Sequence, residues 1–219
     1  MLSDFPGSPH TLKGALVVFE TRAPIPTNLI VFQYNPETMS RSFSQQSSDG
    51  DPRQQSGRSV NLLPPTESFS VTVELDAADQ LEAANPLVLA TGLHPTLAAL
   101  ELLLYPPSTA LILNKVLALA GSALISPAQS PMVLFVWGPA RVLPVRVSSV
   151  SFTEEAFDQL LNPIRAKVQL SLRTLTGAEL RDAGPPFDTL ALVQQIAKEV
   201  LARANIFVAV DRIGASLSF

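Results

Sequence analysis

The sequence contains no cysteine and only two histidines, His10 and His94, which lie far apart in the chain. The lack of cysteine excludes disulfides, thiol nucleophiles and cysteine-based zinc sites, and two distant histidines do not predict a histidine-rich metal site. Charged residues make up 16% of the chain, against about 25% in an average soluble domain. Apolar residues make up 47%, so a sizeable core is expected, with membrane or partner contacts over part of the surface.

The net charge of −4 and the isoelectric point near 5.2 do not favour nucleic acid as a ligand. Binding to free nucleic acid depends on many lysine and arginine contacts to phosphates. The first ten residues, MLSDFPGSPH, contain an acid and two prolines where a secretory signal would be apolar. We therefore expect the chain to be made and folded in the cytoplasm.

Residues 116–140 carry no charge, and this stretch is long enough to cross a bilayer. However, it contains three prolines, a glutamine and several serines, which are typical of a helix end and a loop. We therefore predict a buried helix and strand here, without stable membrane insertion.

Motifs for chemistry are also missing. The segment GDPRQQSGRS at residues 50–59 lacks the lysine and the spacing of a phosphate-binding loop, and no Gly-x-Ser-x-Gly occurs. The acidic pairs are best interpreted as structural, and His94 as a capping or surface histidine; the pairs are Asp49/Asp51, Asp76/Asp79 and Glu154/Glu155. We predict no catalytic residue, no cofactor and no metal site, and keep a hydrolase with an unrecognised site only as a minor alternative.

Hydrophobic periodicity predicts strands in both halves of the chain. The first-half strands are expected at residues 12–20, 28–34 and 67–77, separated by a proline-marked loop and a long polar loop at 44–59. The later strands are expected at 132–137, 141–152 and 164–175, with Pro144 indicating an edge position or a bulge. A last short strand is expected at 206–211.

Helices are predicted in the middle and near the end of the chain. Residues 94–105 and 108–121 form two candidates, and Gly121 is a plausible C-cap of the second. Residues 187–207 form an amphipathic helix capped by Asp188. Its apolar stripe comprises Leu190, Val193, Ile196, Ala197, Val200, Leu201 and Ala204.

These elements predict a mainly β fold with flanking α-helices, an antiparallel β-barrel or sandwich. The barrel is expected over residues 1–180, with a helical insertion around 94–121. Residues 181–219 then form an extension made of the amphipathic helix and the short strand.

The stretch FQYNPETMSRSF at residues 32–43 contains a strand end, a stiff Asn-Pro turn and further aromatic and basic residues. With no nucleophile, metal ligand or phosphate-binding loop nearby, we interpret it as a joint in an assembly rather than an active-site loop. Trp137 before Gly138-Pro139 fits a core or interface aromatic better than a ligand platform. The assembly-interface candidates are Phe32, Tyr34, Asn35, Pro36, Arg41 and Trp137.

The strand at 164–175 has one apolar face and one polar, positive face. Arg165, Lys167 and Arg173 alternate with the apolar residues of this strand. On its own such a face is the solvent side of a sheet. This face would indicate a functional role only if it lined a space shared by several subunits.

Taken in order, the motifs FQYNPETM, SFSVTVELDAAD, GLHPTLAALELLLYP and WGPARVLPVRVSSVSFTEEAFDQLLNPIRAKV give the sequence a family resemblance. Over residues 12–175 it resembles the tube-initiator proteins of phage-tail-like contractile injection systems, which are related to tail proteins with a LysM module. No LysM-like pattern follows residue 175, so the resemblance does not extend to contacts made through that module.

The resemblance implies a tail-tube-like β-barrel with no catalytic residues. It implies a hexameric ring between the spike-bearing hub and the inner tube protein, with baseplate wedge or sheath proteins as further neighbours. The ring would initiate tube assembly in a particle built in the cytoplasm, and Arg165, Lys167 and Arg173 would face its lumen or a neighbouring ring. We also expect residues 44–59 to be mobile in the free subunit and to be ordered by a partner ring. The alternative from another class is a monomeric β-barrel that binds a small apolar ligand.

Overall fold

The computed structural model describes residues 12–19, 25–45, 65–121 and 130–217, with side chains up to residue 206. Seven antiparallel strands form one sheet, in the order β2-β1-β5-β6-β7-β4-β3. The strands are β1 (Ala15–Phe19), β2 (Asn28–Val31), β3 (Met39–Ser44), β4 (Thr66–Asp76), β5 (Met132–Val136), β6 (Val142–Phe157) and β7 (Pro163–Thr174). The helices are α1 (Ala78–Glu82), α2 (Pro86–Thr91), α3 (His94–Glu101), α4 (Ser108–Leu119), α5 (Gly177–Ala183) and α6 (Pro185–Leu217).

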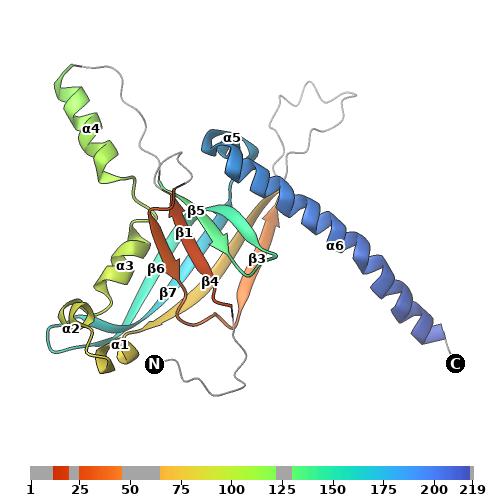
Figure 1. Ribbon diagram of the computed structural model, residues 1–219, viewed down its shortest axis with the longest axis horizontal. Helices are drawn as coiled ribbons and strands as arrows, with labels where there is room; N and C mark the ends of the chain where they lie inside the picture. The colour runs from red at the N-terminus through yellow and green to blue at the C-terminus, as the bar shows by residue number, and fades with distance from the viewer. Residues whose placement is uncertain (1–11, 20–24, 46–64, 122–129, 218–219) are drawn as a thin grey trace.

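Two antiparallel pairs from the first part of the chain flank a three-stranded meander from the second part. The pair β1–β2 forms one edge of the sheet and the pair β3–β4 forms the other. The meander β5–β6–β7 lies between them, with β5 next to β1 and β7 next to β4 (Figure 1). The sheet is therefore completed by contacts between segments far apart in the sequence.

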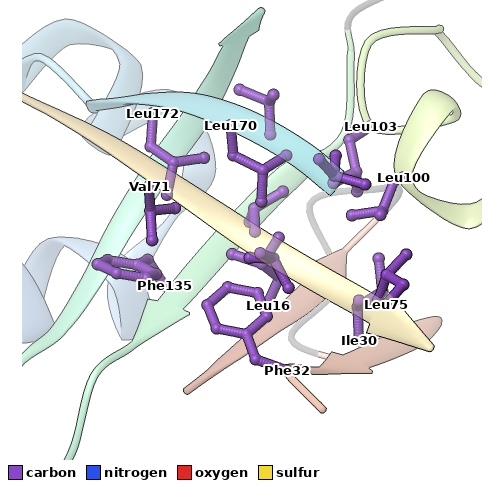
Figure 2. Close-up of a cluster of buried hydrophobic side chains, with 14 of the residues drawn as sticks. Leu16, Ile30, Phe32, Val71, Leu75, Leu100, Leu103, Phe135, Leu170 and Leu172 are labelled. Atoms are coloured by element: carbon purple, nitrogen blue, oxygen red, sulfur yellow. The ribbon is translucent and has the colours of Figure 1, made fainter. Parts of the chain in front are cut away.

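The inner face of the sheet holds the core. The predicted alternation of β4 is confirmed, since Phe69, Val71, Val73 and Leu75 are all buried. The alternation of β7 is confirmed as well, with Ala166, Val168, Leu170 and Leu172 buried on the same face. Figure 2 shows Leu16, Ile30 and Phe32 from one end of the strand order close to Leu75, Leu100 and Leu103. A strongly curved sheet, covered in part by α3, encloses one hydrophobic cluster.

The expected closed barrel is not what the sheet forms. Within the described residues no ladder joins the edge strands β2 and β3, so the sheet stays open. The fold is thus a mixed arrangement of helices with an antiparallel sheet. Alternation along a strand sets which residues face inward, but closure also needs strand number, tilt and stagger to agree.

Helices α1 to α3 follow β4 in the chain and precede the meander. They lie at one end of the sheet (Figure 1). Gly92, between α2 and α3, has a φ of +56°, and a Cβ there would lie 2.5 Å from the Pro163 carbonyl oxygen. The next residue, Leu93, donates its backbone N–H to that same oxygen at 2.8 Å. Glycine at position 92 is therefore required for the helical segment to pack against the start of β7.

Helices α4 and α6 extend away from the sheet. Figure 1 shows α4 standing off on one side and most of α6 reaching away on the other. Gly121 follows the α4 C-cap with a φ of +73°, as predicted for a helix-ending glycine. Helix α6 starts at Pro185, so Asp188 lies in its first turn and is not the N-cap that we expected.

Three further expectations need correction. Residues 206–211 belong to α6 and not to a short strand. Strand β3 was not predicted, because its alternating serines resemble the polar loop that follows. Pro144 lies in an interior strand, paired with Leu134, and no register shift falls on it. The Pro144 carbonyl oxygen accepts the N–H of Leu175. This position lies just beyond the last β6–β7 pair, Val145–Thr174, so the N–H that proline lacks is not needed for the β6–β7 ladder.

The polar loop expected to be mobile lies, from residue 46 onward, outside the described residues. As for the uncharged stretch 116–140, none of the helices in the described ranges has the length and apolar character needed to cross a membrane.

Candidate assembly surfaces

The stretch interpreted as a joint connects the two edges of the sheet. It leaves β2 at residue 32 and enters β3 at residue 39. The Gln33 side chain donates to the Asp76 carbonyl oxygen at 2.8 Å and accepts the Asp76 N–H at 2.9 Å. One side-chain amide thus imitates a backbone pair between the end of β2 and the end of β4. The contact joins the edge strand β2 to β4, which lies next to the other edge strand, β3.

Asn35 holds the other side of the same turn. Its Oδ1 accepts the Gly14 N–H at 2.9 Å, and its Nδ2 donates to the Leu12 carbonyl oxygen at 2.7 Å. Pro36 is half-buried and Tyr34 is half exposed. The joint is therefore built inside one subunit, and Tyr34 is the aromatic side chain that it offers to the surface.

Two of the interface candidates belong to the protein interior. Phe32 is 1% exposed, and Trp137 is half-buried with its ring centroid 6.4 Å from that of Phe32. A Cβ on Gly14 would lie 2.7 Å from the Phe32 ring and 3.0 Å from the Trp137 ring, so glycine makes room for both. Contrary to our expectation, the Phe32 side chain is not offered to a partner.

Tyr34 and the cationic residues of β7 were separate candidates in the sequence, and the fold brings them together. A shallow hollow of about 270 Å³ is lined by Tyr34, Glu74, Asp76, Glu155, Arg165 and Lys167, together with Leu75 and Ala166. Arg165 donates through Nη2 and Nε to Asp76 Oδ2, at 2.8 and 3.0 Å. The Ala78 N–H, and then Arg165, hold the pKa of Asp76 below its usual value.

Lys167 is paired in the same hollow. Its Nζ lies 2.9 Å from a Glu155 carboxylate oxygen and 4.0 Å from one of Glu74. The bond to Glu155 raises the pKa of Lys167. Two cations here face three carboxylates, so the face that we expected to be positive is wet but not positive.

Arg173 lies further along β7 in a different cluster. Arg173 and Arg146 are directly opposite each other on β7 and β6, and such like charges repel unless a counter-ion lies between them. Glu179 of α5 supplies it, at 2.8 Å from Arg173 and 3.8 Å from Arg146. Glu179 also completes a capping box with Thr176. Hydrogen bonds from Arg173, and to a lesser extent from Thr176, lower the pKa of Glu179 to about 2.

Arg41 belongs to a cluster of charged side chains that attaches α6 to the sheet. It shares the inner face of the sheet with Glu67, whose side chain is only 4% exposed, and the two form an ion pair. Lys198 of α6 reaches the other Glu67 oxygen at 2.6 Å. Both cations lie over the Phe43 ring, at 4.6 and 5.8 Å from its centroid. Arg41, Glu67 and Lys198 are hereafter called the Glu67 triad.

A second contact holds the beginning of α6. Phe187 is buried, and its ring meets that of Phe19 in β1 edge to face, with centroids 5.1 Å apart. The helix is thus attached at residues 187 and 198, and the turns beyond residue 198 extend away from the sheet (Figure 1). The predicted apolar stripe of α6 exists but is largely open to solvent, with Val193, Ile196 and Val200 at 50%, 51% and 59% exposed.

Helix α4 exposes even more apolar surface. No residue of α4 is buried. Ile112, Val116 and Leu119 share one face with Lys115, and the three apolar side chains are 62%, 56% and 82% exposed. Scattered exposed leucines are ordinary, but a whole apolar helix without cover is typical of an interaction surface.

A groove of about 710 Å³ with a mixed lining runs between α5–α6 and the adjoining ends of β3, β4, β6 and β7. Its uncharged polar lining includes Gln45, Thr66, Thr174, Thr176, Gln194 and Gln195. Its apolar lining includes Phe43, Leu143, Pro144, Leu175, Leu180, Ala191 and Leu192. Its charged lining consists of Glu67, Lys198 and Asp188. Glu67 is paired with both Lys198 and Arg41, while Asp188 has no ion-pair partner in the part of the chain that the structure describes. We call this hollow the α6 groove.

No cluster of three or more histidine, aspartate or glutamate residues is placed to hold a metal in the described ranges. His94 is exposed at the start of α3, and Asp76 serves the Gln33 and Arg165 contacts already described. Asp49 and Asp51 lie outside the described residues.

No family model and no curated protein matches the chain.

Proposed function

We propose that the chain is a non-catalytic structural subunit of a contractile injection particle. In this proposal it forms a hexameric ring that joins the spike-bearing hub to the inner tube and starts tube assembly. The family in the proposal comes from the resemblance of the sequence motifs over residues 12–175. The observation that carries an assembly role is independent of that resemblance: two helices, α4 and α6, expose apolar faces that the rest of the described chain does not cover.

The open sheet supports the same role. Its two edge strands, β2 and β3, have unpaired backbone groups along their outer sides within the described residues. Soluble monomers usually protect such edges, since they template pairing with other chains. A ring subunit has partners for these edges, and closed rings of identical subunits use a different patch on each side of every contact.

The polar outer face of β4, β6 and β7 is then proposed to face the lumen or a neighbouring ring. Its support is that Arg165 and Lys167 lie on the side of the sheet opposite the core, beside carboxylates that fix their positions. A map of the assembled ring tests this directly. Finding both side chains on the particle exterior would contradict this orientation.

Electron microscopy of negatively stained protein and native mass spectrometry test the ring itself. We expect the purified chain to form rings of six, alone at high concentration or when mixed with the hub and inner tube proteins of the same particle. We expect these rings to shorten the lag before the tube protein polymerises. A chain that stays monomeric in every mixture and leaves the lag unchanged would refute the proposal.

The α6 groove favours one second candidate, a monomer that binds a small apolar ligand. Its volume of about 710 Å³ falls within the usual range for ligand sites. Native mass measurement before and after solvent extraction of the purified monomer distinguishes the two functions. A stoichiometric lipid-like adduct on the monomer would favour the ligand carrier, whereas the ring proposal predicts none.

A further inference from the structure

We infer that the turn between β6 and β7 is a preformed docking element. Its tip inserts leucine side chains into an apolar cleft of a different protein, and the rim of that cleft carries lysine or arginine. The inference goes beyond the proposed function, which assigns no contact to this turn. It rests on that function only in naming the hub and inner tube proteins as the partners to test.

The turn presents apolar side chains to solvent. Residues 158–162 connect β6 to β7, and Leu160 and Leu161 at the tip are 75% and 76% exposed. Figure 1 shows the turn and α2 together at one end of the molecule. Helix α2 adds Leu87 and Leu89, which are 58% and 51% exposed. Single exposed leucines are ordinary, but a group of them on neighbouring segments is typical of an interaction surface.

The backbone of the tip works against local preference. Leu161 has a φ of +65°, in the left-handed region that favours glycine and asparagine. Its N–H donates to the Asp158 carbonyl oxygen at 3.1 Å, and this bond closes the turn. A hairpin loop of this kind usually has glycine at the left-handed position. An exposed leucine there gains nothing from burial within its own subunit, and such strained positions are concentrated where proteins hold ligands and partners.

Neighbouring side chains fix the shape of the turn. Asp158 Oδ1 accepts the N–H groups of Leu160 and Asn162, at 2.7 and 2.8 Å. The Asn162 side chain donates to Asp158 Oδ2 at 2.9 Å and to the Ala90 carbonyl oxygen of α2 at 3.3 Å. The tip is therefore held in place against α2 before any partner binds, so docking costs little loop ordering.

The charge around the tip indicates what covers it. Residues 77–105, which include α1 to α3, and residues 156–164 contain no lysine or arginine. Their carboxylates are Asp79, Glu82, Glu101 and Asp158. None of these forms an ion pair in the part of the chain that the structure describes. A cleft with a basic rim complements this acidic end, whereas an anionic lipid surface would repel it.

A second copy of the chain does not supply such a rim within its described residues. Carboxylates of the same chain already hold Arg41, Arg146, Arg165, Lys167, Arg173 and Lys198. The other described cations lie on separate segments, namely Lys13 before β1, Lys115 in α4, Arg141 in the β5–β6 turn, Arg181 in α5 and Arg203 in α6. The lining of the α6 groove contains none of the cations on these separate segments. The partner is therefore a different protein.

Leu161→Gly separates docking from stability. Glycine adopts a φ of +65° without strain, so the variant should melt at the same temperature as the wild type or higher. The same variant should bind the hub or inner tube protein about tenfold more weakly, because it lacks one of the two inserted side chains. The matched control is Gln159→Ser at an exposed position of the same turn, and it should change neither quantity. A Leu161→Gly chain that binds as tightly as the wild type would overturn the inference.

A photoreactive benzophenone amino acid at position 160 identifies what covers the tip. The labelled chain is irradiated with the hub protein, with the inner tube protein, with further copies of itself or with phosphatidylcholine vesicles, and crosslinked products are identified by mass spectrometry. We expect a crosslink to an apolar segment of the hub or inner tube protein beside a lysine or arginine. Crosslinks to copies or lipid alone, or none at all, would overturn the docking inference.

The two proposals fail separately. Hexameric rings that shorten the polymerisation lag without a crosslink from position 160 to the hub or inner tube protein would overturn the docking element and leave the proposed ring intact. A chain that stays monomeric and leaves the lag unchanged, but crosslinks from position 160 to one of these two proteins, would overturn the ring and support the docking element.

Discussion

Loss of the Lys198 ammonium group should loosen the attached half of α6 by an amount that the Glu67 triad allows us to estimate. The Glu67 side chain is 4% exposed, whereas that of Lys198 is 48% exposed. In Lys198→Met the carboxylate stays buried with Arg41 as its remaining cation. The variant therefore separates the effect of the ion pair from that of the aliphatic stem, which methionine largely retains.

The expected cost lies between two limits. Removing one partner of a fully buried pair costs about 3–5 kcal/mol, whereas an exposed pair contributes about 0–1 kcal/mol. Because Arg41 still binds the carboxylate and Lys198 is half exposed, we expect about 1–2 kcal/mol from Lys198→Met. Glu67→Gln should cost a similar amount. The double variant should cost less than the sum of the two single variants by about 1 kcal/mol, since both remove the same pair.

Urea unfolding of the monomer measures these costs, and Trp137, the single tryptophan, reports on the sheet. Hydrogen exchange then locates the effect, with faster exchange expected at residues 187–198 and little change in β5 and β6. Lys13→Met is the matched control, an exposed lysine remote from the triad. Additive costs in the double variant, or unchanged exchange in α6, would refute our account of how the helix is attached.

Three further predictions concern single positions. Gly92→Ala should destabilise the fold by about 1–3 kcal/mol in urea, because its Cβ would lie 2.5 Å from the Pro163 oxygen; a cost below about 0.5 kcal/mol contradicts this. Gln33→Leu should cost about 1–3 kcal/mol and speed exchange of the Asp76 amide, which loses its acceptor. Glu179 should contribute stability that is fully present above its unfolded pKa of 4.5 and lost as the pH falls through about 2. With the carboxylate about a quarter exposed, we expect on the order of 1–2 kcal/mol, and a Glu179→Gln variant whose unfolding energy has the same pH dependence over that window would contradict it.

The face of each long strand was predictable from the sequence, because period-two alternation leaves little choice. In β4 and β7 every inward position assigned from the pattern is buried or half-buried, from Phe69 to Leu172. Strand β3 was missed because serine has little preference for strands. Its inward residues Met39, Arg41 and Phe43 do alternate with serines, and that alternation was the available signal.

The open sheet and the full length of the last helix could not be predicted from local sequence patterns. The run IFVAVD at residues 206–211 has the β-branched and aromatic composition of a strand. The preceding helical residues 185–205 override that preference, since extending a helix is far easier than starting a new element. Whether two sheet edges meet depends on how much the whole sheet curves, and no short window of sequence contains that information.

The candidate surfaces were predictable in part. Sequence reasoning correctly placed Arg165 and Lys167 opposite the core, but not their partners, because Glu74 and Glu155 come from strands on either side of β7. The groove was missed for the same reason, since its lining combines residues from Phe43 to Lys198. The exposed apolar face of α4 has a readable pattern, although only the structure shows that the rest of the described chain leaves this face uncovered.

The strand order also has a consequence for folding. Leu16 pairs with Phe135, and Phe69 pairs with Leu172, so each N-terminal strand pair waits for a neighbour more than a hundred residues later in the sequence. Loops of that length close slowly relative to local hairpins. During synthesis the inner strands β1 and β4 of these two pairs therefore each have an unpaired edge until the meander emerges and inserts between them. The apolar faces of these early pairs are the part of the newly made chain that most needs protection from aggregation.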